Sequence, residues 1–166
     1  MDEIDRRLLE LLQDDATLSI AQMAECVGLS QTPCWKRIQR LEKNGVIARR
    51  VAVVDPEQVG LGLSVFVNVE AGDHTPEWLH RFSIGLSAMP EVMEIYRMAG
   101  DVDYVLRVAV ADMAAYDAFY KRLIAVAPMR NVTSRFAMER MKHTTAYPLP
   151  PRAFRDRRAA DQGDKE

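Results

Sequence analysis

Apolar residues in the first third of the chain recur every three or four positions, which predicts three short amphipathic helices. Ser19 and Gln22 have the spacing of a capping box at the start of the second helix, and Gly28 suits the left-handed position that ends it. Ser30 is placed to cap the third helix, which closes at Gly45. The helices are expected at about residues 2–13, 19–27 and 30–44.

The third predicted helix has two different faces. Cys34, Ile38 and Leu41 follow i, i+4, i+7 spacing and are expected to face a core. The other side is basic and rich in amides, which is typical of the recognition helix of a helix-turn-helix motif in the major groove. Contacts to double-stranded DNA are therefore expected from Ser30, Gln31, Thr32, Trp35, Lys36, Arg37, Gln39, Arg40 and Lys43.

An ordinary helical hairpin with a solvated charged face would give the same pattern. The net charge of −2 also argues against a uniformly basic nucleic-acid binder. The charge is unevenly distributed, however, and the local field is what attracts phosphate. Between Ser30 and Arg50, the basic residues Lys36, Arg37, Arg40, Lys43, Arg49 and Arg50 stand against Glu42 alone.

Valines follow the helical region, and the pattern there changes. Val51, Val53 and Val54 favour a strand, so residues 46–54 are expected to form the wing of a winged helix or a strand that joins two domains. Asp55-Pro56, Gly60 and Gly62 then mark a turn and a linker. A domain boundary is expected there.

The second half of the chain predicts the order βαββαβ, a split βαβ sheet with helices on one face. Strands are expected at 63–70, 92–99, 104–110 and 132–142, with helices at about 75–89 and 112–127. Large apolar residues remain for the uncovered face, and self-association is the simplest way to bury them. Those residues are Phe66, Tyr96, Met98, Phe136 and Met138.

Composition excludes several classes of protein. With 166 residues, 48% hydrophobic and 28% charged, the chain has an ordinary globular composition, and no apolar run approaches the ~20 residues of a membrane span. The acidic N-terminus lacks the basic start of a signal peptide, so a cytoplasmic location without membrane association is expected. No histidine or cysteine spacing indicates a metal site, although Cys34 leaves a thiol redox switch open.

Three stretches together resemble the Lrp/AsnC (feast/famine) family of transcriptional regulators. They are DEIDRRLLELLQDDATLSIAQMAECVGLS, SQTPCWKRIQRLEKNGVI and AGDVDYVL. The resemblance implies an α+β fold: a winged helix-turn-helix DNA-binding domain (1–50), a linker or strand (51–62) and a ferredoxin-like βαββαβ effector-binding and oligomerisation domain (63–148). Ala99, where the family often has Thr or Ser, and the tail 149–166, expected to be disordered, depart from the pattern.

The resemblance also implies a homo-oligomer and a small effector. Dimers would form through the sheets and assemble to tetramers or octamers, and an amino acid would bind between dimers, with no cofactor, metal or catalytic residue. Backbone amides near Gly100 suit a carboxylate, and Asp101 and Asp103 suit an ammonium group. The full set of expected effector-binding residues is Met98, Gly100, Asp101, Asp103, Tyr104, Thr133 and Arg135.

Three alternatives to this reading stay open. The Gly-Asp turn has a composition that any hairpin turn would show. A second alternative is an effector-independent architectural DNA-binding protein, which would use the oligomer only to bend or bridge DNA. An enzyme is a further alternative, since ferredoxin-like dimers can house small active sites, but it would need a convergent acid–base or metal pair that the sequence does not show.

Overall fold

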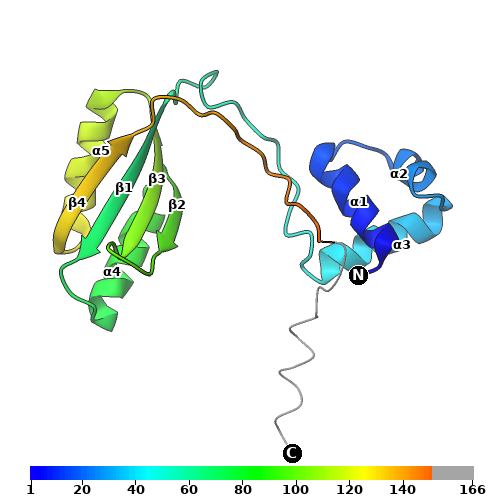
Figure 1. Ribbon diagram of the computed structural model, residues 1–166, viewed down its shortest axis with the longest axis horizontal. Coiled ribbons are helices and arrows are strands. Elements are labelled where there is room, and N and C mark those ends of the chain that lie inside the picture. The colour runs from blue at the N-terminus through cyan, green and yellow to red at the C-terminus, as the bar shows by residue number, and fades with distance from the viewer. Residues whose placement is uncertain (151–166) are drawn as a thin grey trace, which may run out of the picture. The chain divides into compact units, whose positions relative to one another are not determined.

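The computed structural model describes residues 1–150, which divide into two compact units. One unit contains residues 1–52 and the described residues from Lys142 onward, and the other spans Val53–Met141. The chain therefore passes between the units twice, once after the third helix and once after the last strand (Figure 1). No helix within residues 1–150 is long and apolar enough to cross a membrane.

The N-terminal unit contains three helices, α1 (Glu3–Asp14), α2 (Ile20–Cys26) and α3 (Gln31–Lys43). The Ser19–Gln22 capping box of α2 is confirmed, with the Ser19 Oγ accepting from the Gln22 N–H. Ser30 occupies the N-cap of α3 as expected, but its side chain makes no capping hydrogen bond. The small core of this unit is built from Leu8, Met23, Ala24, Cys34 and Ile38.

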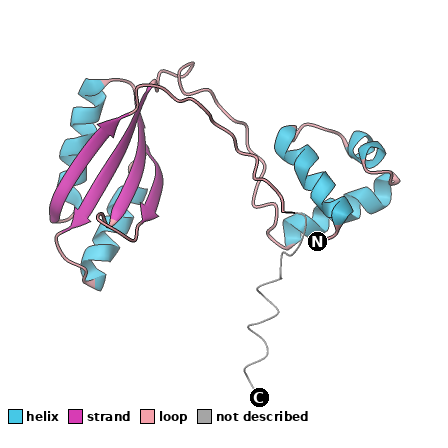
Figure 2. Cartoon of the chain, in the orientation of Figure 1, coloured by secondary structure: helices cyan, strands magenta, loops and turns pink. Residues whose placement is uncertain are grey.

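The second unit is a four-stranded antiparallel sheet with the strand order β2-β3-β1-β4. Figure 2 shows both helices of this unit on one side of the sheet. The order βαββαβ and this strand order confirm the ferredoxin-like arrangement. The elements are β1 (Leu63–Ala71), α4 (Pro76–Ser87), β2 (Val92–Arg97), β3 (Tyr104–Val110), α5 (Met113–Val126) and β4 (Met129–Phe136).

Alternation along the strands divides the sheet into a covered face and an open face. Val65, Val67 and Val69 of β1 are fully buried beneath the helices, whereas Phe66 between them is exposed. Tyr96 and Met98 are exposed as well. The open apolar face that the sequence predicts is therefore present in the single chain.

Phe136 does not belong to the open face, contrary to the expectation. It pairs with Val65, so the two side chains lie on the same, covered side of the sheet. Its ring contacts Tyr116 edge-on, with 5.1 Å between the ring centroids. The last strand also begins and ends earlier than expected, since its pairing with β1 runs from Met129, opposite Ala71, to Phe136, opposite Val65.

The expected wing is absent: residues 46–54 form no strand (Figure 2). Val51, Val53 and Val54 are exposed, at 60%, 66% and 60% of their full surface. A strand needs a neighbour for its backbone hydrogen bonds, and no strand within residues 1–150 pairs with this segment. The predicted disordered tail lies outside the described residues from position 151 onward.

The end of the described chain contacts α1 through one side chain. The Gln13 carboxamide donates from Nε2 to the Tyr147 carbonyl at 3.3 Å and accepts from the Tyr147 N–H at 2.7 Å. Both residues belong to the N-terminal unit. This unit thus includes a segment from far along the sequence, which no local pattern predicted.

Candidate DNA-binding surface and effector site

The recognition helix candidate α3 presents its faces as its sequence predicts. Cys34, Ile38 and Leu41 are buried, at 0%, 1% and 3% exposure, and fix the side of the helix that packs on α1 and α2. The residues on the opposite side of the helix are solvent-exposed. They form an outward stripe of Thr32, Lys36, Gln39 and Lys43.

The outward stripe keeps most of its polar groups available. No ion pair within residues 1–150 involves Lys36 or Lys43. The Gln39 carboxamide donates to Glu42 at 3.0 Å, and Glu42 also accepts from Arg50 at 2.8 Å. Glu42 is thus neutralised locally, and the two lysines of the outward stripe stand outside the ion pairs of residues 1–150.

Gln31 and Trp35 lie on the flank of α3 that faces α2. Together with Ile20 and Thr32 they line a shallow hollow at the start of the two helices. Trp35 is half exposed there, so it is not a core residue. The N-terminal end of a recognition helix is the part that enters the major groove in helix-turn-helix proteins.

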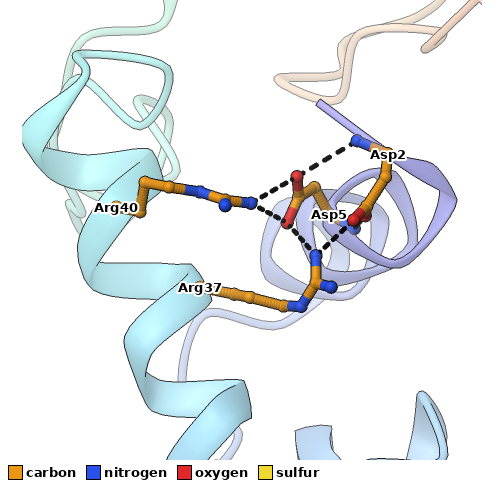
Figure 3. A network of polar contacts seen from close by, with 4 residues as sticks. All are labelled: Asp2, Asp5, Arg37 and Arg40. Carbon is orange, nitrogen blue, oxygen red and sulfur yellow. Dashed lines mark hydrogen bonds and ion pairs between the residues drawn. The ribbon is translucent and has the colours of Figure 1, made fainter.

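Arg37 and Arg40 lie on the other flank of α3, toward α1, and bind carboxylates of that helix (Figure 3). Hydrogen bonding to Asp2 and Asp5 raises the pKa of Arg37. The nine residues expected to bind DNA therefore separate into the outward stripe, two flanks and the N-cap residue Ser30. Sequence spacing missed the acidic partners, because they lie more than thirty residues away on another helix.

The expected effector residues are not gathered into one site by the single chain. Met98, Gly100, Asp101 and Asp103 belong to the turn between β2 and β3. Thr133 and Arg135 pair with Asn68 and Phe66 of β1, so they lie on β4 at the other edge of the sheet.

Tyr104 does not line an exposed pocket. Its side chain is 7% exposed and its ring lies 4.7 Å from that of Phe82 and 5.9 Å from that of Trp78, measured between centroids. It anchors β3 to α4 beneath the sheet. Its place in the sequence beside the turn gave no information on this burial.

Asp103 has a structural role in the turn. Its carboxylate accepts from the Ala71 N–H at 2.8 Å, where the register of β1 shifts, and its own N–H donates to the Val69 carbonyl at 3.0 Å. Gly100 has φ +140°, a backbone conformation that side chains disfavour. An ordinary hairpin turn, in which Gly and Asp are required by the backbone conformation and its hydrogen bonds, therefore accounts for both residues.

Polar residues that the sequence did not single out surround the same end of β1. Glu70 accepts from Asn131 at 3.1 Å and from Arg130 at 2.9 Å, and these two hydrogen bonds lower the pKa of Glu70. The imidazole of His74 lies 3.9 Å from the Asp103 carboxylate. Antiparallel pairing brings the end of β1 beside the start of β3. Knowledge of this pairing would have placed Glu70 and His74 near Asp103.

No group of three or more His, Cys, Asp or Glu side chains within residues 1–150 is arranged to hold a metal ion. Cys26 is exposed and Cys34 is buried, and both are free thiols. Burial raises the pKa of Cys34, which makes its reactive thiolate form less accessible.

Two family models match the chain and together cover most of it. The AsnC-type helix-turn-helix domain matches residues 1–42, and the Lrp/AsnC ligand binding domain matches residues 64–147. The chain is 52% identical over 150 residues to the DNA-binding transcriptional activator DecR of Escherichia coli K12, covering 90% of this chain and 99% of that protein. It is 42% identical over 160 residues to the glutamate uptake regulatory protein of Zymomonas mobilis, covering 96% and 98%.

Solved structures agree with the sequence matches. An AsnC family transcriptional regulator from Agrobacterium tumefaciens superposes with a TM-score of 0.87 at 57% identity, over 90% of this chain and 97% of that chain. A transcriptional regulator from Neisseria meningitidis in complex with L-methionine gives a TM-score of 0.86 at 31% identity, with the same coverage. The chain therefore belongs to the Lrp/AsnC family, which is a family of transcriptional regulators and not of enzymes.

Proposed function

We propose that the chain is a sequence-specific DNA-binding regulator whose assembly or DNA affinity responds to an amino acid. The outward stripe of α3 carries the DNA-binding part of the proposal. Lys36 and Lys43 are exposed and supply charge for phosphate, while Thr32 and Gln39 supply hydrogen-bonding groups for base edges. Ser30, Gln31 and Trp35 extend the same surface toward α2, at the end that enters the groove.

The effector part of the proposal rests on the second unit. Its sequence matches a ligand-binding domain, and a relative of similar fold has been solved with L-methionine. Met98, Gly100 and Asp101 remain our candidates for contact with the amino acid, with Asp103 shaping the turn. Because Met98, Gly100 and Asp101 are exposed in the single chain, we place the site between copies of the chain.

Self-association belongs to the same proposal. The open face of the sheet exposes Phe66, Tyr96 and Met98 in the single chain, and a second copy is the simplest cover for it. A two-fold dimer would read two half-sites separated by about a helical turn of DNA, ~10 bp, or its multiples. We also keep the cytoplasmic location as a prediction, since the proposed partner is chromosomal DNA.

A thermal-shift screen of the full chain against the twenty amino acids tests the effector proposal. A ligand that binds the folded chain raises its apparent melting temperature by mass action. A duplex selected from a random DNA library by the full chain then serves in binding isotherms, with and without the amino acid that gave the shift. If the chain selects a duplex but no amino acid changes either its melting or its DNA affinity, the chain is an architectural binder instead.

A further inference from the structure

Asp5 is a buried carboxylate in the DNA-binding unit. It lies on α1 with 1% of its surface exposed. Among residues 1–150, no other charged residue is buried. Burial of a charge costs free energy unless partners compensate for it. Its partners therefore indicate what this position does.

Both oxygens of Asp5 accept from arginines of α3. The Arg40 Nη2 donates to the two oxygens at 3.0 and 2.8 Å, and the Arg37 Nη1 donates to Oδ1 at 2.9 Å. Asp2 completes the group: its carboxylate accepts from the same Arg37 nitrogen at 2.6 Å, and its N–H donates to Asp5 at 3.1 Å. Figure 3 shows the two arginine side chains reaching from α3 to Asp5 of α1 and to Asp2, the N-cap residue of that helix.

The two arginines differ in what they leave available. Arg37 bridges both carboxylates and is 25% exposed, so the fold occupies it. The side chain of Arg40 is 54% exposed and meets Asp5 through one terminal nitrogen. A guanidinium carries five N–H donors in a planar fork, so Arg40 keeps donors for another acceptor.

Arg40 is also placed where DNA is expected. Lys36, Arg40 and Lys43 follow i, i+4, i+7 spacing, so they share one side of α3. The group of two carboxylates and two guanidinium ions is neutral as a whole. Its contribution to DNA binding is therefore orientation of a donor, while the lysines supply net charge.

We infer that Asp5 is a positioning residue for DNA binding, holding the Arg40 guanidinium by one nitrogen so that its remaining N–H groups meet a DNA phosphate. The inference rests on the proposed function, and it adds a role for a residue of α1 that touches no DNA itself. A long side chain that is fixed before binding loses less entropy on contact. Phosphate contacts of this kind set the register of a protein on the duplex.

A double-mutant cycle between Asp5 and Arg40 tests the inference with the full chain. The probes are the selected duplex and a scrambled duplex of the same composition, each titrated over a range of salt concentrations. Arg40→Ala is expected to weaken binding to both duplexes and to reduce the salt slope by about one. Asp5→Asn is expected to weaken binding by about two- to tenfold, the cost of ordering one long side chain.

The effect of Asp5→Asn must vanish when Arg40 is already alanine. An equal loss in both backgrounds would show that Asp5 acts by packing α1 on α3, and unchanged or tighter binding would likewise overturn the inference. Glu10→Gln is the matched control, because it removes a negative charge from α1 at an exposed residue whose carboxylate pairs with Arg7 of the same helix. It is expected to leave the salt slope unchanged.

A second variant decides the matter if Asp5→Asn does not fold. Arg40→Lys retains the charge but not the planar fork, so it is expected to keep the salt slope and still bind severalfold more weakly than wild type. Full affinity with lysine would overturn the inference, since orientation by Asp5 would then be unnecessary. If wild type selects no duplex at all, the proposed function fails, and the inference fails with it.

Discussion

Replacement of Asp103 separates its role in the turn from a role in binding an amino acid. Asp103→Ala removes the acceptor that satisfies the N–H of Ala71, a residue 5% exposed. Asp103→Asn keeps an oxygen acceptor at that position but removes the charge. The pair of variants therefore distinguishes the hydrogen bond from the carboxylate charge.

The expected magnitude follows from the burial of the two groups. Loss of a partner for a buried N–H costs about 1–3 kcal/mol. The Asp103 side chain is 32% exposed, so water reaches the site and we expect the lower half of that range, about 1–2 kcal/mol, for Asp103→Ala. Asp103→Asn should cost less than about 1 kcal/mol, because a neutral hydrogen bond replaces a charged one.

Urea unfolding followed by tryptophan fluorescence measures this cost. The chain has two tryptophans, and Trp78 is buried in the second unit. In a Trp35→Phe background the fluorescence reports that unit alone. With a slope of about 1–3 kcal/mol/M, Asp103→Ala should lower the midpoint by about 1 M.

Two results would refute this reasoning. An unchanged midpoint for Asp103→Ala would mean that the Ala71 N–H needs no partner from the turn. The thermal-shift assay, repeated with Asp103→Asn, tests the charge. If that folded variant loses the response to an effector amino acid, Asp103 is an ammonium partner and more than a structural residue of the turn.

Three further predictions concern other parts of the chain. Gly85→Ala should destabilise the second unit by about 1–3 kcal/mol in urea unfolding, because the added Cβ would lie 2.5 Å from Val126 Cγ1, and a second change of Val126 to Ala should relieve the cost. Phe66→Glu should shift the chain toward monomer in light scattering, whereas Leu79→Glu, an equally exposed change on α4, should not. Hydrogen bonds from the Asp5 N–H and then Arg37 lower the pKa of Asp2, so its stabilisation is present above the ordinary aspartate pKa and is lost as the pH falls through the lowered value. Acid unfolding followed by circular dichroism should show this loss in wild type and a smaller one in Asp2→Asn.

Local patterns in the sequence determined the elements and the class of the fold. Helical spacing at Cys34, Ile38 and Leu41 gave the buried side of the recognition helix, and the Ser19–Gln22 capping box formed as its spacing requires. The order βαββαβ and the open sheet face also followed from periodicity alone. These features depend on residues within a few positions of one another, where the spacing of side chains along a helix or strand is fixed.

Strand pairing decided what spacing could not. Whether residues 46–54 form a strand depends on a partner, and the described part of the chain provides none. The side of the sheet that Phe136 occupies depends on its register with Val65. Tyr104 is likewise a neighbour of the turn in sequence but a core residue in space.

The partners of the charged residues were also decided by the tertiary structure. Arg37 and Arg40 read from the sequence as groups for DNA, yet the packing of α1 on α3 brings Asp5 between them. The spacing of basic residues along α3 contains no information about Asp5, which lies more than thirty residues away in the sequence. The basic character of the recognition helix was therefore evident from the sequence. Only the fold decided which of its arginines are bound within the chain, because ion pairs form between groups that packing brings together.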